Sequence, residues 1–214
     1  MKRIRLMLCL AVFGTALSCK PKIRPDLISG SIQQSLGQKM CDLTAQALGA
    51  SGGKVLLLME NKGQDKLDAC YGYRVGFEAG LKRHPRLSVV DIEMPPFPKE
   101  GTERDALGLR LAYYQRLRAQ YPDVACFVSF VQAPFFTDEE MEQWDSATMP
   151  KIVTSLKMQP RHPWRDLVKH GIVQAVVVPV QQTLPSAEPK GDYKSIFDLY
   201  YSVATVENLD KIGP

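Results

Sequence analysis

Lys54-Val55-Leu56-Leu57-Leu58-Met59-Glu60-Asn61 is the stretch that decides the fold. It is a short, almost continuous apolar run that follows a Gly-Gly pair and ends in polar residues. A strand that is apolar on both faces is typical of a parallel sheet with helices on each side. We therefore expect a central strand here, with Leu56 and Leu58 buried beneath helices on both faces.

Helical and strand-like segments alternate on both sides of this run. Helical spacing of apolar residues is seen over 32–47, 67–81, 107–117, 163–171 and 192–200, and strand-like runs over 87–94, 124–131, 151–155, 172–180 and 201–206. Alternation without hairpin signals indicates βαβ units with right-handed crossovers. The sequence predicts an α/β fold, a three-layer α/β/α sandwich around a mainly parallel sheet of about five to six strands.

Two short motifs predict where helices begin. Thr102-Glu103-Arg104-Asp105 and Thr137-Asp138-Glu139-Glu140 both have a hydroxyl followed three residues later by an acid, the pattern of a capping box. Asp192 is expected to cap the last helix. The segment 49–54 contains a Gly-Gly-Lys run, but Val55 follows the lysine and the run precedes its strand, so we interpret it as a turn rather than a phosphate loop.

The first residues have the composition of a targeting segment. A basic start with Lys2, Arg3 and Arg5 leads into an apolar stretch from Leu6 to Leu17 that is short for a transmembrane helix. We expect residues 1–19 to be a signal peptide, 20–30 an extended tether and 31–214 a single α/β domain.

The end of that segment, Ala16-Leu17-Ser18-Cys19, resembles the bacterial lipoprotein box. The resemblance implies that Cys19 is lipidated and becomes the mature N-terminus. The protein would then be exported and lipid-anchored to a bacterial membrane, facing the periplasm or the cell exterior. Ala16 and Leu17 depart from the residues that the box prefers. The alternative is an ordinary signal peptide with an incidental cysteine.

Charge and cysteine content exclude several classes of function. Without the three basic residues of the leader, 27 − 3 = 24 basic residues face 23 acidic ones, so no basic surface for nucleic acid is indicated. Cys41, Cys70 and Cys126 form no CxxC or Cys/His cluster, and we expect neither a metal nor a cofactor. We expect these three to be small buried residues; whether two of them form a disulfide is left open.

Catalytic motifs are scarce. The chain has neither the G-x-S-x-G elbow of α/β-hydrolases nor the G-x-G-x-x-G fingerprint of dinucleotide-binding folds. His84, His162 and His170 fall in surface turns or beside a short basic helix. We therefore expect a protein without bond-making chemistry.

A ligand site is expected where the parallel strands end, because ligands of open α/β sheets bind beyond the carboxyl ends of the strands. Carboxamides there donate and accept hydrogen bonds, and aromatic side chains supply an apolar wall. The candidate ligand-binding residues are Glu60, Asn61, Phe97, Gln132, Phe135 and Phe136.

Several segments together resemble the type-1 periplasmic substrate-binding proteins, the family that includes the ligand domain of lac-repressor-like regulators. They are Tyr73–Leu81 with His84-Pro85 and Leu87–Asp91, Tyr121–Val124, Leu167–Ala175 and Tyr201–Asn208. The resemblance implies that family's fold, export and small-molecule recognition. Members of the family have two lobes, whereas this chain has residues for little more than one. Gly63-Gln64-Asp65 also replaces an aromatic residue often found after the first strand.

The sequence thus favours a membrane-anchored lipoprotein with one binding-protein-like lobe. It would bind a small polar solute, sugar-like or amide-containing, or a transporter or envelope protein. The alternatives are an exported hydrolase-like enzyme on a flavodoxin-like sheet and a non-catalytic interaction module.

Overall fold

The computed structural model describes residues 25–66, 68–99, 101–104, 106–156, 163–180 and 189–212. Six strands form one sheet in the order β2-β1-β3-β4-β5-β6. They are β1 Gly53–Leu58, β2 Leu87–Glu93, β3 Val124–Ser129, β4 Lys151–Ser155, β5 Val173–Pro179 and β6 Tyr201–Ala204. The first five are parallel to their neighbours, and β6 is antiparallel to β5. The expected strand number and mainly parallel pairing are confirmed.

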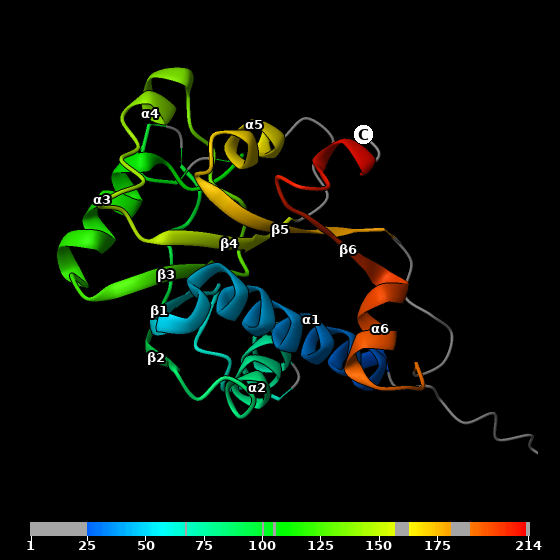
Figure 1. The fold of residues 1–214 in the computed structure, drawn as a ribbon. Coiled ribbons are helices and arrows are strands. Elements are labelled where there is room, and N and C mark those ends of the chain that lie inside the picture. Colours follow the sequence, from blue (N-terminus) through cyan, green and yellow to red (C-terminus); the bar gives the residue numbers. More distant parts are fainter. Residues whose placement is uncertain are drawn as a thin grey trace, which may run out of the picture.

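Helices cover both faces of the sheet, as Figure 1 shows. One face carries α1 Pro25–Leu48, α2 Ala69–Leu81 and α6 Tyr193–Tyr200, and the other carries α3 Leu111–Gln120, α4 Asp138–Glu142 and α5 Trp164–Lys169. Short 3-10 turns at Gly49–Ser51 and Leu209–Lys211 complete the described elements. The three-layer α/β/α sandwich is therefore confirmed.

Strand β1 is buried from both sides. Val55 and Leu57 pack in the cluster with α1 and α2, while Leu56 and Leu58 pack in the cluster with α3 and α5. None of the four is more than 1% exposed. The apolar run therefore has the role that its composition predicts, a strand that contributes to two cores.

Glycines allow α1 and α2 to share one face of the sheet. A Cβ atom added at Gly76 would lie 2.1 Å from the Gln34 carbonyl oxygen, and one at Gly37 would lie 2.2 Å from the Tyr73 carbonyl oxygen. Such separations lie well inside van der Waals contact, so the two helix backbones touch almost directly. Together with Gly72 and Gly80, Gly76 forms a stripe along α2, one residue in every four.

A polar cluster joins α6 to α1 and α2. The Tyr193 hydroxyl donates to Asp42 at 2.6 Å, and Arg83 and the His84 ring contact the same carboxylate at 2.9 Å and 2.8 Å. Burial raises the pKa of Asp42, but the hydrogen bonds from Tyr193, His84 and Arg83 outweigh it and hold this pKa below its ordinary value. The last helix is thus held by a charged carboxylate.

Two boundaries differ from those expected. Helix α1 begins at Pro25, so residues 25–30 of the expected tether are helical, while the signal segment and residues 20–24 lie outside the described residues. Helix α3 begins at Leu111 and not at Thr102. The Thr102 hydroxyl donates to the Lys99 and Arg104 carbonyls instead of capping a helix. The capping box of Thr137 and Glu140 and the Asp192 cap are both confirmed.

The three cysteines in the described ranges are free and buried. Burial raises the pKa of the Cys41 thiol to about 12, with the nearby Asp42 charge adding to the effect, and burial raises that of Cys126 to about 12. Burial also raises the pKa of Cys70. Across the described part of the chain, no helix is long and apolar enough to cross a membrane.

Replacing Gly76 by alanine should destabilise the protein. The new methyl group would collide with the Gln34 backbone, and forced overpacking of this kind costs about 1–3 kcal/mol. Urea unfolding followed by circular dichroism measures this loss of unfolding free energy.

Gly30 in α1 provides the matched control, because nothing lies within 4 Å of a Cβ atom added there. Gly30→Ala should leave stability unchanged or raise it by about 0.5–1 kcal/mol, since alanine costs less helix entropy than glycine. Equal stability changes in the two variants would contradict the close helix contact.

Candidate functional site

The carboxyl ends of β1 to β5 meet along one edge of the sheet, called here the carboxyl edge. The chain passes from β1 to β2 on one side and then crosses over β1 to β3 on the other. Beyond the ends of β1 and β3 lies the point where strand order reverses, which is the usual ligand position in open parallel sheets. Glu60 follows β1 there, and Gln132 follows β3.

The described residues of the connection from β2 to α3, 94–99, 101–104 and 106–110, lie over this point. Arg104, 5% exposed, donates two hydrogen bonds to the Glu60 carboxylate at 2.9 Å and 3.1 Å. It also donates to the Pro96 carbonyl at 3.1 Å. A bidentate pair between a buried guanidinium and a carboxylate is strong and directional. Arg104 therefore holds the connection against the end of β1.

Further contacts close the space between this connection and β3. The Gln132 side chain donates to the Ala106 carbonyl at 3.3 Å, and Leu109 forms a parallel bridge with Pro134. Phe135 donates its backbone N–H to the Leu109 carbonyl at 3.0 Å. The chain's own residues thus occupy the crevice that the sheet order would offer to a ligand.

The candidate residues are on the expected edge but take different roles. The Asn61 amide donates to Asp68 at 2.9 Å and its oxygen accepts from the Gly63 N–H at 2.7 Å, so it shapes the loop before α2. Phe136 is 3% exposed and packs against Tyr114 and Trp144 in the core.

The other two aromatic candidates are less enclosed. Phe135 is half-buried, with the Arg110 guanidinium 5.8 Å from its ring centre. Phe97 is 92% exposed. Glu60 is bound to Arg104 and Gln132 to the Ala106 carbonyl, so both side chains already have partners within the chain.

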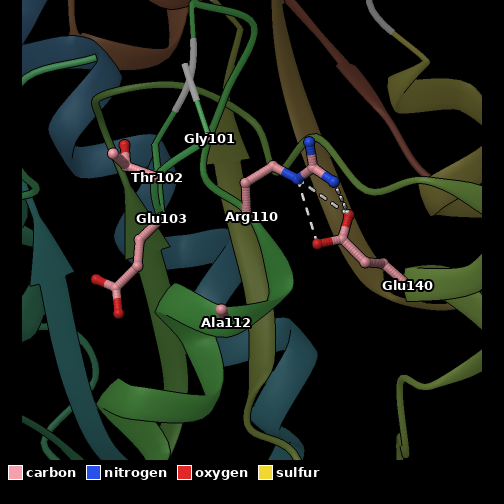
Figure 2. Close-up of a pocket in the computed structure, with 6 residues that line it drawn as sticks. All are labelled: Gly101, Thr102, Glu103, Arg110, Ala112 and Glu140. Atoms are coloured by element: carbon pink, nitrogen blue, oxygen red, sulfur yellow. Dashed lines mark hydrogen bonds and ion pairs between the residues drawn. The ribbon is translucent and has the colours of Figure 1, made fainter. Parts of the chain in front are cut away.

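An open pocket of about 500 Å³ lies beside the connection, at the start of α3. Its described lining residues are Gly101, Thr102, Glu103, Arg110, Ala112 and Glu140. Figure 2 shows the Arg110 and Glu140 side chains joined to each other, while Glu103 points away from them. We call it the edge pocket.

Ion pairs fix the charged side chains of the edge pocket. Arg110 contacts Glu140 through Nη2 at 2.9 Å and through Nε at 3.1 Å, and Glu140 also accepts the Thr137 N–H at 2.9 Å. Glu103 pairs with Arg116 at 3.0 Å. The pocket therefore offers carboxylates, a guanidinium and a hydroxyl, which can hydrogen-bond a polar solute.

Sequence reasoning missed these lining residues. The capping box did place Glu140 at a helix start, and the helix that follows β3 starts on the carboxyl edge. Thr102 had the same kind of signal, although no helix starts there, and Arg110 had none, because the sequence placed it inside a helix. The described residues contain no group of three His, Cys, Asp or Glu side chains that could hold a metal ion.

Comparisons with known proteins identify the fold. No protein-family model matches the sequence, and no curated protein matches it. An ABC transporter solute-binding protein from Burkholderia graminis, solved with D-arabinose, aligns with a TM-score of 0.55 at 15% identity. A periplasmic solute-binding protein from Actinobacillus succinogenes, solved with D-allose, aligns at 0.53 and 13%. A chain of the XylFII–LytSN complex aligns at 0.52 and 13%.

The chain has the fold of one lobe of these proteins. The alignments cover 85%, 84% and 82% of this chain but only 62%, 62% and 60% of the three solved chains. The resemblance to type-1 periplasmic binding proteins is thus confirmed for the fold. The partial coverage agrees with a single lobe.

Removing the Glu60 carboxylate should loosen the connection over the carboxyl edge. Glu60→Ala leaves the buried Arg104 with the Pro96 carbonyl alone, and an unpaired buried group of this kind costs about 1–3 kcal/mol. We expect a lower urea midpoint and faster amide hydrogen exchange in residues 94–104.

Lys62→Ala is the matched control. It removes an ion pair with Asp91 whose side chains are each 45% exposed, and such surface pairs contribute less than about 1 kcal/mol. If Glu60→Ala changed stability and hydrogen exchange no more than Lys62→Ala does, Arg104 would not be what holds the connection.

Proposed function

We propose that this protein is an exported lipoprotein whose single lobe binds a small, hydroxyl-rich solute in the edge pocket. The observation that carries the proposal is the polar lining of that pocket by Thr102, Glu103, Arg110 and Glu140 at the carboxyl edge. Carboxylates accept hydrogen bonds and a guanidinium donates them, so together they match hydroxyl groups, which do both.

The fold supports this assignment of ligand class. Solved proteins that share it were determined with D-arabinose and D-allose bound. This chain spans only about 60% of those proteins, and the described lobe would contact its ligand from one side. Shallow burial gives modest affinity, since fewer contacts offset the entropy lost on binding.

The residues of the edge pocket favour binding over catalysis. Its described lining contains no cysteine, histidine or lysine, and the Thr102 hydroxyl is engaged with two backbone carbonyls. A nucleophile needs a neighbouring base or a shifted pKa to react. We therefore favour solute recognition over the hydrolase alternative.

Filling the edge pocket should abolish solute binding. Ala112 is exposed at the start of α3, and Ala112→Trp would place an indole in the pocket without disturbing the core. A panel of pentoses, hexoses, amino acids and nucleosides is screened by thermal shift and confirmed by calorimetry. We expect at least one sugar to raise the melting temperature of the parent protein, because a ligand that binds only the folded state stabilises it.

Ala119→Trp, on an exposed position of the same helix outside the pocket, is the control. The sugar should still bind this variant and should bind Ala112→Trp at least about tenfold more weakly, a loss of about 1.4 kcal/mol. A panel without any sugar that stabilises the parent, or equal affinities in the two variants, refutes the edge pocket as a sugar site.

Cys19→Ser should release the protein from the membrane. The variant has no thiol at the position where the sequence resembles a lipoprotein box, so it should fractionate with soluble exported proteins. Mass spectrometry of the parent protein should find Cys19 at the N-terminus with a lipid attached. An unmodified Cys19, or a mature chain without it, would refute the anchor.

A further inference from the structure

Exposed apolar side chains gather on the carboxyl edge. Met94, Phe97 and Leu107 lie in the connection after β2, Val180 follows β5, and Leu199 is in the last turn of α6, next to the start of β6. Among the described residues, the other large apolar side chains that are exposed are Val90 within β2 and Val206 beyond β6. Met94, Phe97 and Leu107 belong to one connection, and exposed apolar side chains that lie together mark interaction sites.

The most exposed of these side chains belongs to a well-held loop. Phe97, 92% exposed, sits in Met94-Pro95-Pro96-Phe97-Pro98-Lys99, where three prolines restrict the backbone. The Arg104 guanidinium binds the Pro96 carbonyl and the Glu60 carboxylate beneath it. A buried ion pair thus fixes a loop that presents an aromatic ring to the outside.

The start of α1 is on the same edge. Gly72 of α2 packs against Gln33 of α1, and Gly80 packs against Cys41, so the two helices run side by side in the same direction. Helix α2 follows β1 and therefore begins at the carboxyl edge, and α1 must begin there as well. Figure 1 shows this end of α1 beside α6, in agreement with the contact of Ile32 with Ile196 and Tyr200.

The length of chain before α1 limits its distance from an anchor at Cys19. Five residues, 20–24, separate Cys19 from Pro25. Fully extended, the six steps between these two residues span about 20 Å. Three of the five residues, Lys20, Lys22 and Arg24, are basic and none is acidic.

We infer that the carboxyl edge faces the lipid bilayer and that the Phe97 loop inserts its ring among the headgroups. This inference rests on the proposed anchoring at Cys19. The short anchor holds the edge near the bilayer, and a rigid aromatic loop suits the interface between headgroups and acyl chains. Lys99 and the basic residues before α1 would add attraction to anionic lipids.

This orientation has a consequence for the edge pocket. The pocket lies on the same edge as the Phe97 loop, between that connection and the start of α3. Its solute would then be taken from the layer of water next to the bilayer. The inference favours a lipid surface over a soluble protein partner, because the anchor brings the edge to the bilayer in every molecule.

A tryptophan placed at either of two positions tests the orientation in the full-length lipidated protein. Phe97→Trp reports on the loop, and Val206→Trp reports on an exposed site beyond the antiparallel strand β6, at the opposite edge. Each variant is reconstituted into phosphatidylethanolamine–phosphatidylglycerol vesicles with or without brominated acyl chains. The parent protein supplies the background of Trp144 and Trp164.

The emission added by Phe97→Trp should shift to shorter wavelength and be quenched by brominated lipid, as expected for a ring at interfacial depth. The emission added by Val206→Trp should change little. Absence of quenching at Phe97→Trp, or equal quenching at both positions, overturns the inference. A blue shift that occurs only in native membranes and without lipid quenching assigns the loop to a protein partner and overturns it as well.

Flotation of the same vesicles separates this inference from the proposals on which it rests. A protein that floats with the vesicles but shows no quenching at Phe97→Trp is anchored with another orientation. A protein that does not float refutes the anchor and the orientation together. Sugar binding is measured separately in detergent, so its outcome is independent of both.

Discussion

The direct contact between the α1 and α2 backbones is the constraint on which the arrangement of the other elements depends. At Gly37 and Gly76 the two helix backbones meet directly, and Gly80 makes room for the Cys41 side chain, so both helices fit over one face of a six-stranded sheet. This places α1 across β3, β4 and β5, where it supports α6 through Asp42 and Tyr193. The same contact fixes the end of the sheet at which α1 begins, and therefore the edge closest to the N-terminal segment.

Much of the fold could be predicted because a strand that is buried on both faces appears in the sequence as a continuous apolar run. The run from Val55 to Leu58 is buried on both faces and therefore has to be apolar throughout. The helices around it have apolar residues at helical spacing on the face that packs against the sheet. The start of α3 could not be predicted in this way. Thr102 and its neighbours have the pattern of a helix cap. Arg104, however, forms hydrogen bonds with Glu60, a residue far away in the sequence, and no helix starts at Thr102. Long-range pairs of this kind override local signals.

The sequence predicted the edge of the sheet at which the candidate site lies, but not which side chains line it. Strand order alone brings Glu60, Gln132 and the residues after β2 to one edge. Which way each side chain points depends on partners that no local pattern reveals, such as Asp68 for Asn61 and the Ala106 carbonyl for Gln132. The Phe136 side chain is buried because it packs against Tyr114 and Trp144. The glycine stripe of α2 and its partner helix are seen only in the structure.

The three buried thiols affect how the protein reacts with oxidants and disulfides around it. Thiol oxidation and disulfide exchange proceed through the thiolate, and burial keeps Cys41, Cys70 and Cys126 protonated at neutral pH. The described part of the chain therefore folds without a disulfide among these three cysteines, and their buried thiols present no thiolate that could form mixed disulfides. The described lobe therefore does not depend on the redox potential of its surroundings, because packing, hydrogen bonds and ion pairs hold it together without a disulfide.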